Sequence, residues 1–263
     1  MISTVIDKKV CNGFSNAAVR YDRRTDLHKE IGRRLAGKIE KVEDSLPLLD
    51  VGMGTGFFTR QLKDRFPDAV VVGLDFAPGM VACARQKEGQ LIIVQADAAH
   101  LPFKEGAFGV IASNLAYQWV EDLPRAFALC RSRLRQSGRL YLTMFGHDTF
   151  HELFTALDAC AGGNGGPKGP SVRRLADKTQ VTEALKAADF HAPLVETEHR
   201  KVHFPDMMHL IKWIKDIGAN TLPRDVYMGK DLLLRANRHY NAYFRDPSGV
   251  YATFEVIWVE ARR

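Results

Sequence analysis

Three glycines spaced two residues apart form the pattern in this sequence that points most directly to chemistry. Gly52, Gly54 and Gly56 occur in LLDVGMGTGFFT, between an apolar run that predicts a strand and an amphipathic run that predicts a helix. Glycines at such a turn let the backbone bend tightly and approach a ligand closely. Their spacing is not the G-x-G-x-x-G of dinucleotide-binding proteins, and no Gly-Lys-Ser/Thr follows, so a diphosphate ligand is not indicated.

Carboxylates stand at or just after the ends of three successive predicted strands. Asp50 ends the strand before the glycines, and Asp75 ends the next strand, 19 residues after Gly56, where a carboxylate can hold ribose hydroxyl groups. Each acid alone has a simpler explanation, because Asp75 could cap the helix that begins near Pro78 and Asp97 could be a turn residue. Three such loops in order at successive strand ends favour a cofactor site.

Short apolar runs alternate with amphipathic stretches from residue 46 onward. This alternation predicts repeated βα units and a doubly wound, Rossmann-like α/β sheet. The predicted core strands are 46–51, 69–75, 91–96, 108–113 and 139–145. The predicted helices between them are 57–66, 78–87 and 122–135. Such sheets bind ligands at the carboxyl ends of their strands, where the three acidic loops lie.

The segments that flank this core are mostly helical. Residues 14–41 predict one or two amphipathic helices that cap the open edge of the sheet, and 161–170 predict a loop rich in Gly and Pro. The later predicted elements are helix 178–188, strand 194–204, helices 206–218 and 229–245, and final strand 249–261. The last helical pair interrupts two strands and is a candidate lid. The expected organisation is a helical cap (1–45), a core (46–204), a helical lid insertion (205–248) and a final core strand (249–263).

The composition of the 263 residues, with 46% hydrophobic and 26% charged, is that of a folded globular protein and excludes disorder or a collagen-like chain. No apolar run approaches the length that spans a bilayer, and the N-terminal segment lacks the layout of a signal peptide. We therefore expect a cytoplasmic protein without membrane contact. The net charge of +6 allows an acidic partner, although solubility alone would explain it.

The cysteines and histidines show no metal-ligand spacing in the sequence. The four cysteines are far apart and form no C-x-x-C pair, and His199, His203 and His209 do not converge at metal-ligand spacing. The sequence therefore predicts neither a disulfide framework nor a metal site.

The glycine loop resembles motif I of class I S-adenosylmethionine-dependent methyltransferases, with Asp75 at the acidic end of their second strand. QADAAHLPF (95–103) and SNLAYQWVEDL (113–123) resemble later loops of that family. The resemblance implies a seven-stranded, mostly parallel sheet with an antiparallel last strand, S-adenosylmethionine as cofactor and S-adenosylhomocysteine as product. It implies that Asp97 accepts from the adenine amino group, that Ala98 offers its backbone, and that the strand-four segment lies beside the methionine end. The implied cofactor-binding residues are Asp50, Gly52, Gly54, Gly56, Asp75, Phe76, Asp97, Ala98, Asn114 and Leu115.

The segment SNLAYQWVEDLPRAF (113–127) is similar, more specifically, to the malonyl-acyl carrier protein O-methyltransferase family of biotin synthesis. The same resemblance is carried by FSNAAVRYDRRTDLHKEI (14–31), DMMHLIKWIKDIGANTL (206–222) and YATFEVIWVEARR (251–263). It implies methyl transfer to the free carboxylate of a malonyl thioester, an early step of pimeloyl synthesis. The implied partner is an acidic acyl carrier protein carrying malonate, or malonyl-coenzyme A. A nucleic acid substrate is not expected, because the base-methylation motif Asn/Asp-Pro-Pro-Phe/Tyr is missing after strand four and the chain has no Pro-Cys pair.

The chemistry of a malonyl acceptor makes few demands on the protein. A malonyl carboxylate, with a pKa of roughly 3–4, is an anion at neutral pH and needs no general base. Catalysis would depend on aligning it with the methyl group and on removing water from it. The resemblance puts Tyr21 beside the cofactor as a closing residue, and Tyr117, Gln118 and Trp119 are candidates for positioning the acyl group. Tyr21 could equally be a half-buried aromatic residue of a capping helix, and Trp119 could pack in the core.

Cationic side chains that could bind the malonyl carboxylate are too numerous for the sequence to decide between them. The candidates are Arg20, Arg24, Lys212, Lys215 and Arg224, while Arg131 and Arg135, one helical turn apart, could meet the acids of the carrier protein. Each of them could instead be a solvated surface residue.

Two other functions stay open at this point. The core motifs are shared with methyltransferases that act on a quinone precursor or on a free acid such as trans-aconitate. A methyltransferase-like binding or assembly protein that keeps the fold and the cofactor is a second alternative, although complete cofactor loops argue against it. We expect the chain to be a monomer.

Overall fold

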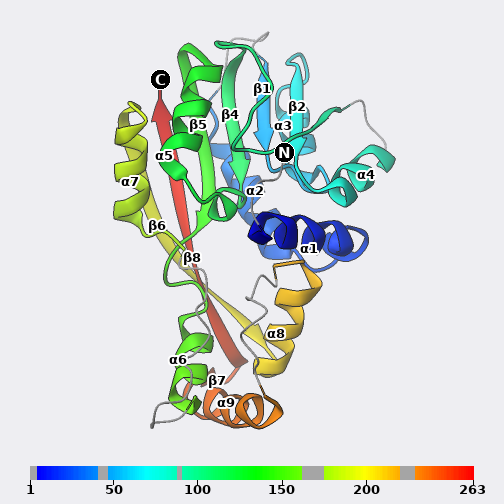
Figure 1. The fold of residues 1–263 in the computed structure, drawn as a ribbon, viewed down its shortest axis with the longest axis vertical. Coiled ribbons are helices and arrows are strands. Elements are labelled where there is room, and N and C mark those ends of the chain that lie inside the picture. Colours follow the sequence, from blue (N-terminus) through cyan, green and yellow to red (C-terminus); the bar gives the residue numbers. More distant parts are fainter. Residues whose placement is uncertain (1–4, 41–46, 88–90, 162–174, 220–228) are drawn as a thin grey trace.

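The computed structural model describes residues 5–40, 47–87, 91–161, 175–219 and 229–263, and a single mixed β-sheet forms its centre (Figure 1). The strands are β1 (Leu48–Val51), β2 (Val71–Asp75), β3 (Ile92–Gln95), β4 (Phe108–Asn114), β5 (Leu134–Phe145), β6 (His191–Phe204), β7 (Arg245–Asp246) and β8 (Gly249–Arg262). Their order is β3-β2-β1-β4-β5-β8-β6, with β7 paired to β8. β8 runs antiparallel to β5 and to β6, while the other pairs of the main path are parallel. The predicted Rossmann-like sheet with an antiparallel last strand is confirmed, and the short β7 is an addition to it.

Nine α-helices occur within the described residues. They are α1 (Val5–Tyr21), α2 (Asp26–Lys38), α3 (Phe57–Arg65), α4 (Pro78–Gln86), α5 (Leu123–Arg133), α6 (His151–Cys160), α7 (Lys178–Ala187), α8 (Met207–Asp216) and α9 (Lys230–Tyr243). α6 is not among the predicted helices, although Leu153, Ala156 and Leu157 have helical spacing and are buried. None of the helices in the described segments is both long and apolar enough to cross a membrane.

Each face of the sheet has its own hydrophobic core. One core contains buried residues of α2, α3, α6, α8 and α9, and the other contains those of α5 and α7. Successive residues of β1 alternate between them, since Leu48 belongs to the first core and Leu49 to the second. Both faces are therefore covered, which explains why the central strands read as continuous apolar runs.

The two N-terminal helices do not lie at an open edge of the sheet, where the sequence analysis expected them. α2 packs on a face, because its buried Ile31 and Leu35 belong to the core that includes α3. α1 lies across the carboxyl end of β2, where the Ser15 hydroxyl accepts a hydrogen bond from the Gly79 amide at 3.3 Å. The helix that was expected to cap an edge is thus positioned over the ligand-binding end of the sheet (Figure 1).

The long strands β6 and β8 extend beyond the rest of the sheet and carry the predicted lid insertion at their far end (Figure 1). Within this insertion, α9 packs against α6, and the Arg235 guanidinium donates to the Cys160 carbonyl at 3.2 Å. α8 lies closer to the core, beside α1. Residues 162–170 of the predicted Gly/Pro-rich loop, and Arg224, lie outside the described residues.

Two glycines allow α1 and the end of α8 to approach each other at backbone distance. A Cβ atom on Gly13, in the interior of α1, would lie 2.5 Å from the Gly218 carbonyl oxygen. A Cβ atom on Gly218 would lie 2.6 Å from the Gly13 carbonyl oxygen, and Gly218 has a φ of +79°. Glycine inside a helix costs about 1 kcal/mol relative to alanine. The close approach is the physical reason for glycine at position 13.

This crossing predicts opposite effects for two glycine substitutions in neighbouring helices. Gly13→Ala should lower the free energy of unfolding by about 1–3 kcal/mol, because α1 and the α8 terminus must separate to accept the methyl group. Gly37→Ala, in α2, should raise it by up to about 1 kcal/mol, because a Cβ there meets nothing within 4 Å. Urea denaturation of both variants would measure this contrast. Equal stabilisation by the two substitutions would contradict the close crossing.

Candidate functional site

A cavity of about 320 Å³ lies between α1 and the carboxyl ends of β1, β2 and β4. It is lined by the glycine loop, by the segments that follow β2, β3 and β4, and by α1 and the first turn of α5. Eight of the ten predicted cofactor-binding residues line it: Gly52, Gly54, Asp75, Phe76, Asp97, Ala98, Asn114 and Leu115. Four loops far apart in the sequence therefore face one space, because parallel strands end at a common edge.

The glycine loop adopts backbone conformations that other residues rarely take. Gly52 and Gly54 have φ values of +77° and +54°. A Cβ atom on Gly54 would have only a Tyr21 ring carbon near it, at 4.0 Å, so the backbone here faces the cavity. The loop thus offers a bare backbone surface to a ligand. Gly56 also has a positive φ, but it begins α3 and is not among the lining residues.

Asp75 connects the glycine loop to the cavity. Its Oδ2 atom accepts a hydrogen bond from the Gly54 amide and its Oδ1 atom accepts one from the Ala77 amide, each at 2.8 Å. Burial raises the pKa of Asp75 to about 6, although these amide hydrogen bonds act in the opposite direction. Each carboxylate oxygen can accept a further hydrogen bond. A ligand in the cavity can therefore donate hydroxyl groups to a carboxylate that is already held in place.

Asp50 lies behind the loop, fully buried and outside the cavity lining. Its Oδ2 atom accepts from the Thr59 hydroxyl at 2.6 Å, whereas its Oδ1 atom is buried and has no hydrogen-bond partner in the described structure. Burial raises the pKa of Asp50 to about 7, against the effect of Thr59, and the nearby charge of Asp75 adds to the rise. A hydrogen-bond donor added beside the unpartnered oxygen would therefore stabilise this buried carboxyl group.

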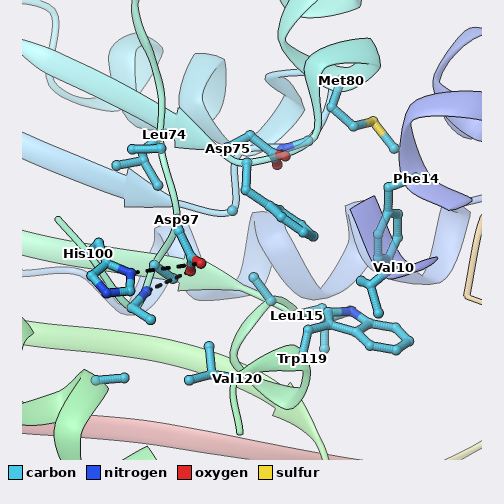
Figure 2. Close-up of a pocket in the computed structure, with 18 of the residues that line it drawn as sticks. Val10, Phe14, Leu74, Asp75, Met80, Asp97, His100, Leu115, Trp119 and Val120 are labelled. Carbon is cyan, nitrogen blue, oxygen red and sulfur yellow. Dashed lines mark hydrogen bonds and ion pairs between the residues drawn. The ribbon is translucent and has the colours of Figure 1, made fainter. Parts of the chain in front are cut away.

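Aromatic side chains form the roof of the cavity. Phe14 packs edge-on against Tyr21 of the same helix and against Trp119 from the segment after β4, with ring centroids 6.3 Å and 5.4 Å apart. Figure 2 shows Phe14 and Val10 of α1 beside Trp119, across from Asp97. The same environment raises the pKa of Tyr21, chiefly through burial, so its hydroxyl group stays protonated. These rings cover part of the cavity with apolar surface.

An ionic cluster fastens the end of α1 to the glycine loop. The Asp22 carboxylate accepts hydrogen bonds from the Thr55 hydroxyl and from the Lys87 ammonium group, which also donates to the Thr55 carbonyl. Burial alone would raise the pKa of Asp22, but the hydrogen bonds from Lys87 and Thr55 outweigh it and leave the pKa below its ordinary value. Asp22, Thr55 and Lys87 come from three different segments, and we call them the roof latch.

Asn114 is oriented by two partners behind the cavity. Its amide nitrogen donates to the His28 carbonyl, and its amide oxygen accepts from the Thr143 hydroxyl, each at 3.0 Å. The His28 ring is buried among Tyr21, Phe145 and Trp213, and burial lowers its pKa to about 4. The imidazole is therefore neutral near pH 7, and its Nδ1 atom has no partner among the described groups.

Tyr117 and Gln118, which the sequence analysis considered for acyl positioning, point elsewhere. The Tyr117 side chain is fully buried, and its hydroxyl group is 2.7 Å from the Cys130 sulfur. The Gln118 side chain is also buried and donates to the Leu115 carbonyl at 2.7 Å. A short 3₁₀ turn over Tyr117–Trp119 is the reason, because it directs Tyr117 into the core and leaves Trp119 on the cavity wall.

Ionisable residues outside the predicted set of site residues also line the cavity. Arg125 is in the first turn of α5, where Asp122 caps the helix by accepting from the Arg125 amide at 3.0 Å. His100 lies three residues after Asp97. Asp122 and Pro124 are residue types that commonly begin helices, so their positions in the sequence could have placed Arg125 next to the β4 loop. Arg131, one of the two arginines that could meet a carrier protein, pairs with Asp189 at 2.8 Å.

Comparison with known proteins gives a consistent set of similarities. A family profile described as a methyltransferase domain matches residues 49–142. The malonyl-[acyl-carrier protein] O-methyltransferase of Geobacter sulfurreducens is 32% identical over 97% of this chain and 98% of its own length. The biotin biosynthesis bifunctional protein BioHC of Cellvibrio japonicus is 30% identical over 98% of this chain and 51% of its own length.

A solved structure shows the same fold. The phosphoethanolamine N-methyltransferase 2 of Haemonchus contortus, in complex with S-adenosyl-L-methionine, has a TM-score of 0.54 and 18% sequence identity. The match covers 91% of this chain and 52% of that chain.

The roof latch predicts that a single charge controls the opening of α1. Asp22→Asn should increase amide hydrogen exchange in α1 by about five- to tenfold, because two charge-assisted hydrogen bonds at a partly exposed site are weakened. Asp26→Asn is a matched control, because the Asp26 side chain is 94% exposed and its ion pair with Lys29 is long, at 3.9 Å. Exchange measured by mass spectrometry would check this. An unchanged rate in α1 would show that the latch does not hold the helix.

Proposed function

The chain belongs to the malonyl-acyl carrier protein O-methyltransferase family, and we propose that it transfers the methyl group of S-adenosylmethionine to the free carboxylate of a malonyl thioester on acyl carrier protein. The product is the malonyl methyl ester, an early intermediate of pimeloyl and biotin synthesis. The observation that carries the proposal is the convergence of the glycine loop, Asp75 and the segments after β3 and β4 on one roofed cavity. A relative that is about one third identical over nearly its whole length supports the choice of acceptor.

The residues of the cavity fit S-adenosylmethionine. The bare backbone at Gly54 leaves room for the close approach of a ligand, and the buried Asp75 carboxylate suits ribose hydroxyl groups. We propose that Asp97 and Ala98 bind the adenine and that Asn114 and Leu115 lie beside the methionine end. The Asp50 Oδ1 atom has no hydrogen-bond partner in the described structure, so it suits an added donor. Because Asp50 does not line the cavity, we propose that a water molecule bridges this oxygen and the ammonium group of the methionine end.

The reaction needs positioning and exclusion of water more than acid–base chemistry. When bound, S-adenosylmethionine supplies an electrophilic methyl group on a positively charged sulfur. The malonyl carboxylate would accept this methyl group, and S-adenosylhomocysteine would leave as the carbon–sulfur bond breaks. Opposite charges are neutralised in this step, so a site with little water favours it. The roof of Phe14, Tyr21 and Trp119 provides such a site.

Proton transfer by the protein is not required, and the buried side chains agree with this. The malonyl carboxylate carries no proton to remove at neutral pH. Tyr21 stays protonated because burial raises its pKa, so its hydroxyl group can donate a hydrogen bond but does not act as a base. We propose that Tyr21 orients the malonyl carboxylate, and that Tyr117 and Gln118 act only by supporting the wall that carries Trp119.

The partner is proposed to be an acidic acyl carrier protein, bound by a monomer of this chain in the cytoplasm. Arg125 is a cation on the cavity wall with an exposed side chain, which suits attraction of an anionic acyl group or its carrier. Arg131 is less suited, because its pairing with Asp189 already joins α5 to the end of α7.

Asp75 predicts a distinct dependence of cofactor affinity on pH. Asp75→Asn should weaken S-adenosylmethionine binding about ten- to hundredfold, through loss of a charged acceptor. In the wild type, affinity should fall as the pH is lowered through about 6, because the Asp75 carboxyl group then takes up a proton. The side-chain amide of the variant cannot titrate, so its S-adenosylmethionine affinity should not show this fall near pH 6. Calorimetric titration from pH 5 to pH 8, with exposed Asp68→Asn as control, would measure both effects.

The proposed reaction is tested by transfer of labelled methyl from S-adenosylmethionine to malonyl-acyl carrier protein. Malonyl-coenzyme A, free malonate, trans-aconitate and a quinone precursor would be assayed in parallel. We expect base-labile label on the carrier protein. Label found only on a free small molecule would show that this molecule, and not malonyl-acyl carrier protein, is the acceptor. Cofactor binding without any transfer would favour a binding or assembly role.

A further inference from the structure

A second cluster of chemically reactive side chains lies away from the cavity, where three parts of the chain meet. His199 is on β6 and Glu255 is on β8, and the two residues are directly opposite each other in the antiparallel ladder. Directly opposed residues place their side chains on the same face of a sheet. Asp148, in the connection between β5 and α6, lies over this pair, with its backbone amide donating to the Glu255 carboxylate at 2.9 Å.

The donor atoms of these residues are close enough to share one ion. One ligand atom from each of Asp148, His199 and Glu255 lies within 4.8 Å of the others. The Asp148 Oδ2 and His199 Nε2 atoms are 3.3 Å apart. In a tetrahedral zinc site with bonds of about 2.0–2.1 Å, neighbouring ligand atoms are about 3.3 Å apart, so this pair already has the required spacing.

Glu255 is an unusual member of the cluster because its carboxyl group is buried without a partner lysine or arginine in the described segments. It is 6% exposed, and no lysine or arginine in the described segments forms an ion pair with it. Its backbone is also held firmly, since its carbonyl accepts from the Gly146 amide and from the Thr149 hydroxyl. A Cβ atom on Gly146 would lie 2.5 Å from Glu255 Oε2. Glycine at position 146 thus makes the space that the carboxylate occupies.

The other side of the cluster is open to solvent. The side chains of Asp148 and His199 are 54% and 51% exposed, so an ion can reach them from water. His147 adds a further donor at the rim, with its Nδ1 atom 3.3 Å from Asp148 Oδ1. One imidazole and two carboxylates from three segments form the mixed nitrogen and oxygen set. Such a set suits zinc and related transition ions better than magnesium or calcium, which prefer oxygen alone.

We propose that Asp148, His199 and Glu255 form a binding site for a divalent transition metal ion of the zinc type. The ion neutralises two adjacent carboxylates, one of them buried, and joins the β5–α6 connection to β6 and β8. None of the three residues lines the cavity beneath α1, so the site is separate from that of the methyl transfer. Its role is structural, because it fastens the start of α6 to the long strands that carry the insertion.

The structure provides a matched control for the histidine. His203 is also on β6, and its Nε2 atom is 2.8 Å from Asp246 Oδ2 in another exposed histidine–aspartate pair. The residue opposite His203 on β8 is Tyr251, not a carboxylate. Two residues alone do not form a tight zinc site, so this pair should contribute little to zinc affinity.

The test is calorimetric titration of the full-length protein, stripped of metal with a chelator, with Zn²⁺. Wild-type protein and His203→Ala should bind one ion with the same affinity, and His199→Ala should bind it at least about tenfold more weakly. Co²⁺ should give the visible absorption of a tetrahedral site without the near-ultraviolet bands of thiolate ligands, which separates this site from the four free cysteines. Zn²⁺ should raise the melting temperature of the wild type and of His203→Ala.

Two results would overturn the proposal. One is the absence of saturable zinc binding by the wild type, and the other is equal affinity in His199→Ala and His203→Ala. His199 is half-exposed, so His199→Ala should fold, and S-adenosylmethionine affinity of each variant provides the check of the fold. Because that affinity belongs to the separate cavity, failure of the metal site would leave the proposed methyl transfer untouched.

Discussion

The hydrogen bond from the Gly54 amide to the Asp75 carboxylate is the interaction on which the candidate site depends. It joins the loop after β1 to the end of β2, and it requires both a left-handed glycine and an acceptor at the strand terminus. Burial makes the carboxylate expensive to ionise, and the amides of Gly54 and Ala77 offset part of that cost. A ligand then meets a charged acceptor that is already oriented, so little order has to be created on binding.

The second requirement is a roof that covers this acceptor. α1 is held by two physically different contacts. At Gly13 the backbone of α1 packs directly on Gly218, which tolerates no added atom. At Asp22 the contact is ionic and partly exposed, with Thr55 and Lys87 as partners, so it can open and re-form at modest cost. The steric contact fixes where α1 crosses the end of α8, and the ionic contact fastens the end of α1 to the glycine loop.

The long antiparallel ladder of β6 and β8 connects these features to the rest of the chain. It continues beyond the parallel core and carries α8, which meets α1, and α9, which packs on α6. Within the insertion, α8 therefore supports the roof by contacting α1. Neither α8 nor α9 lines the cavity. The same ladder sets His199 opposite Glu255, so one pairing register determines both the support of α1 and the second cluster.

The sequence by itself determined the parallel core and the loops that meet at its strand ends. Glycine spacing, strand-terminal acids and apolar runs are local signals, and parallel strands bring their carboxyl ends together whatever the details of packing. The direction of Tyr117 was not determined in this way, because it depends on a 3₁₀ turn and on Cys130 of α5, 13 residues away. Nor was the grouping of Asp148, His199 and Glu255, which are separated by 51 and 56 residues. Only the register of two long strands, and a glycine that admits a buried carboxylate, decided that these three side chains would meet.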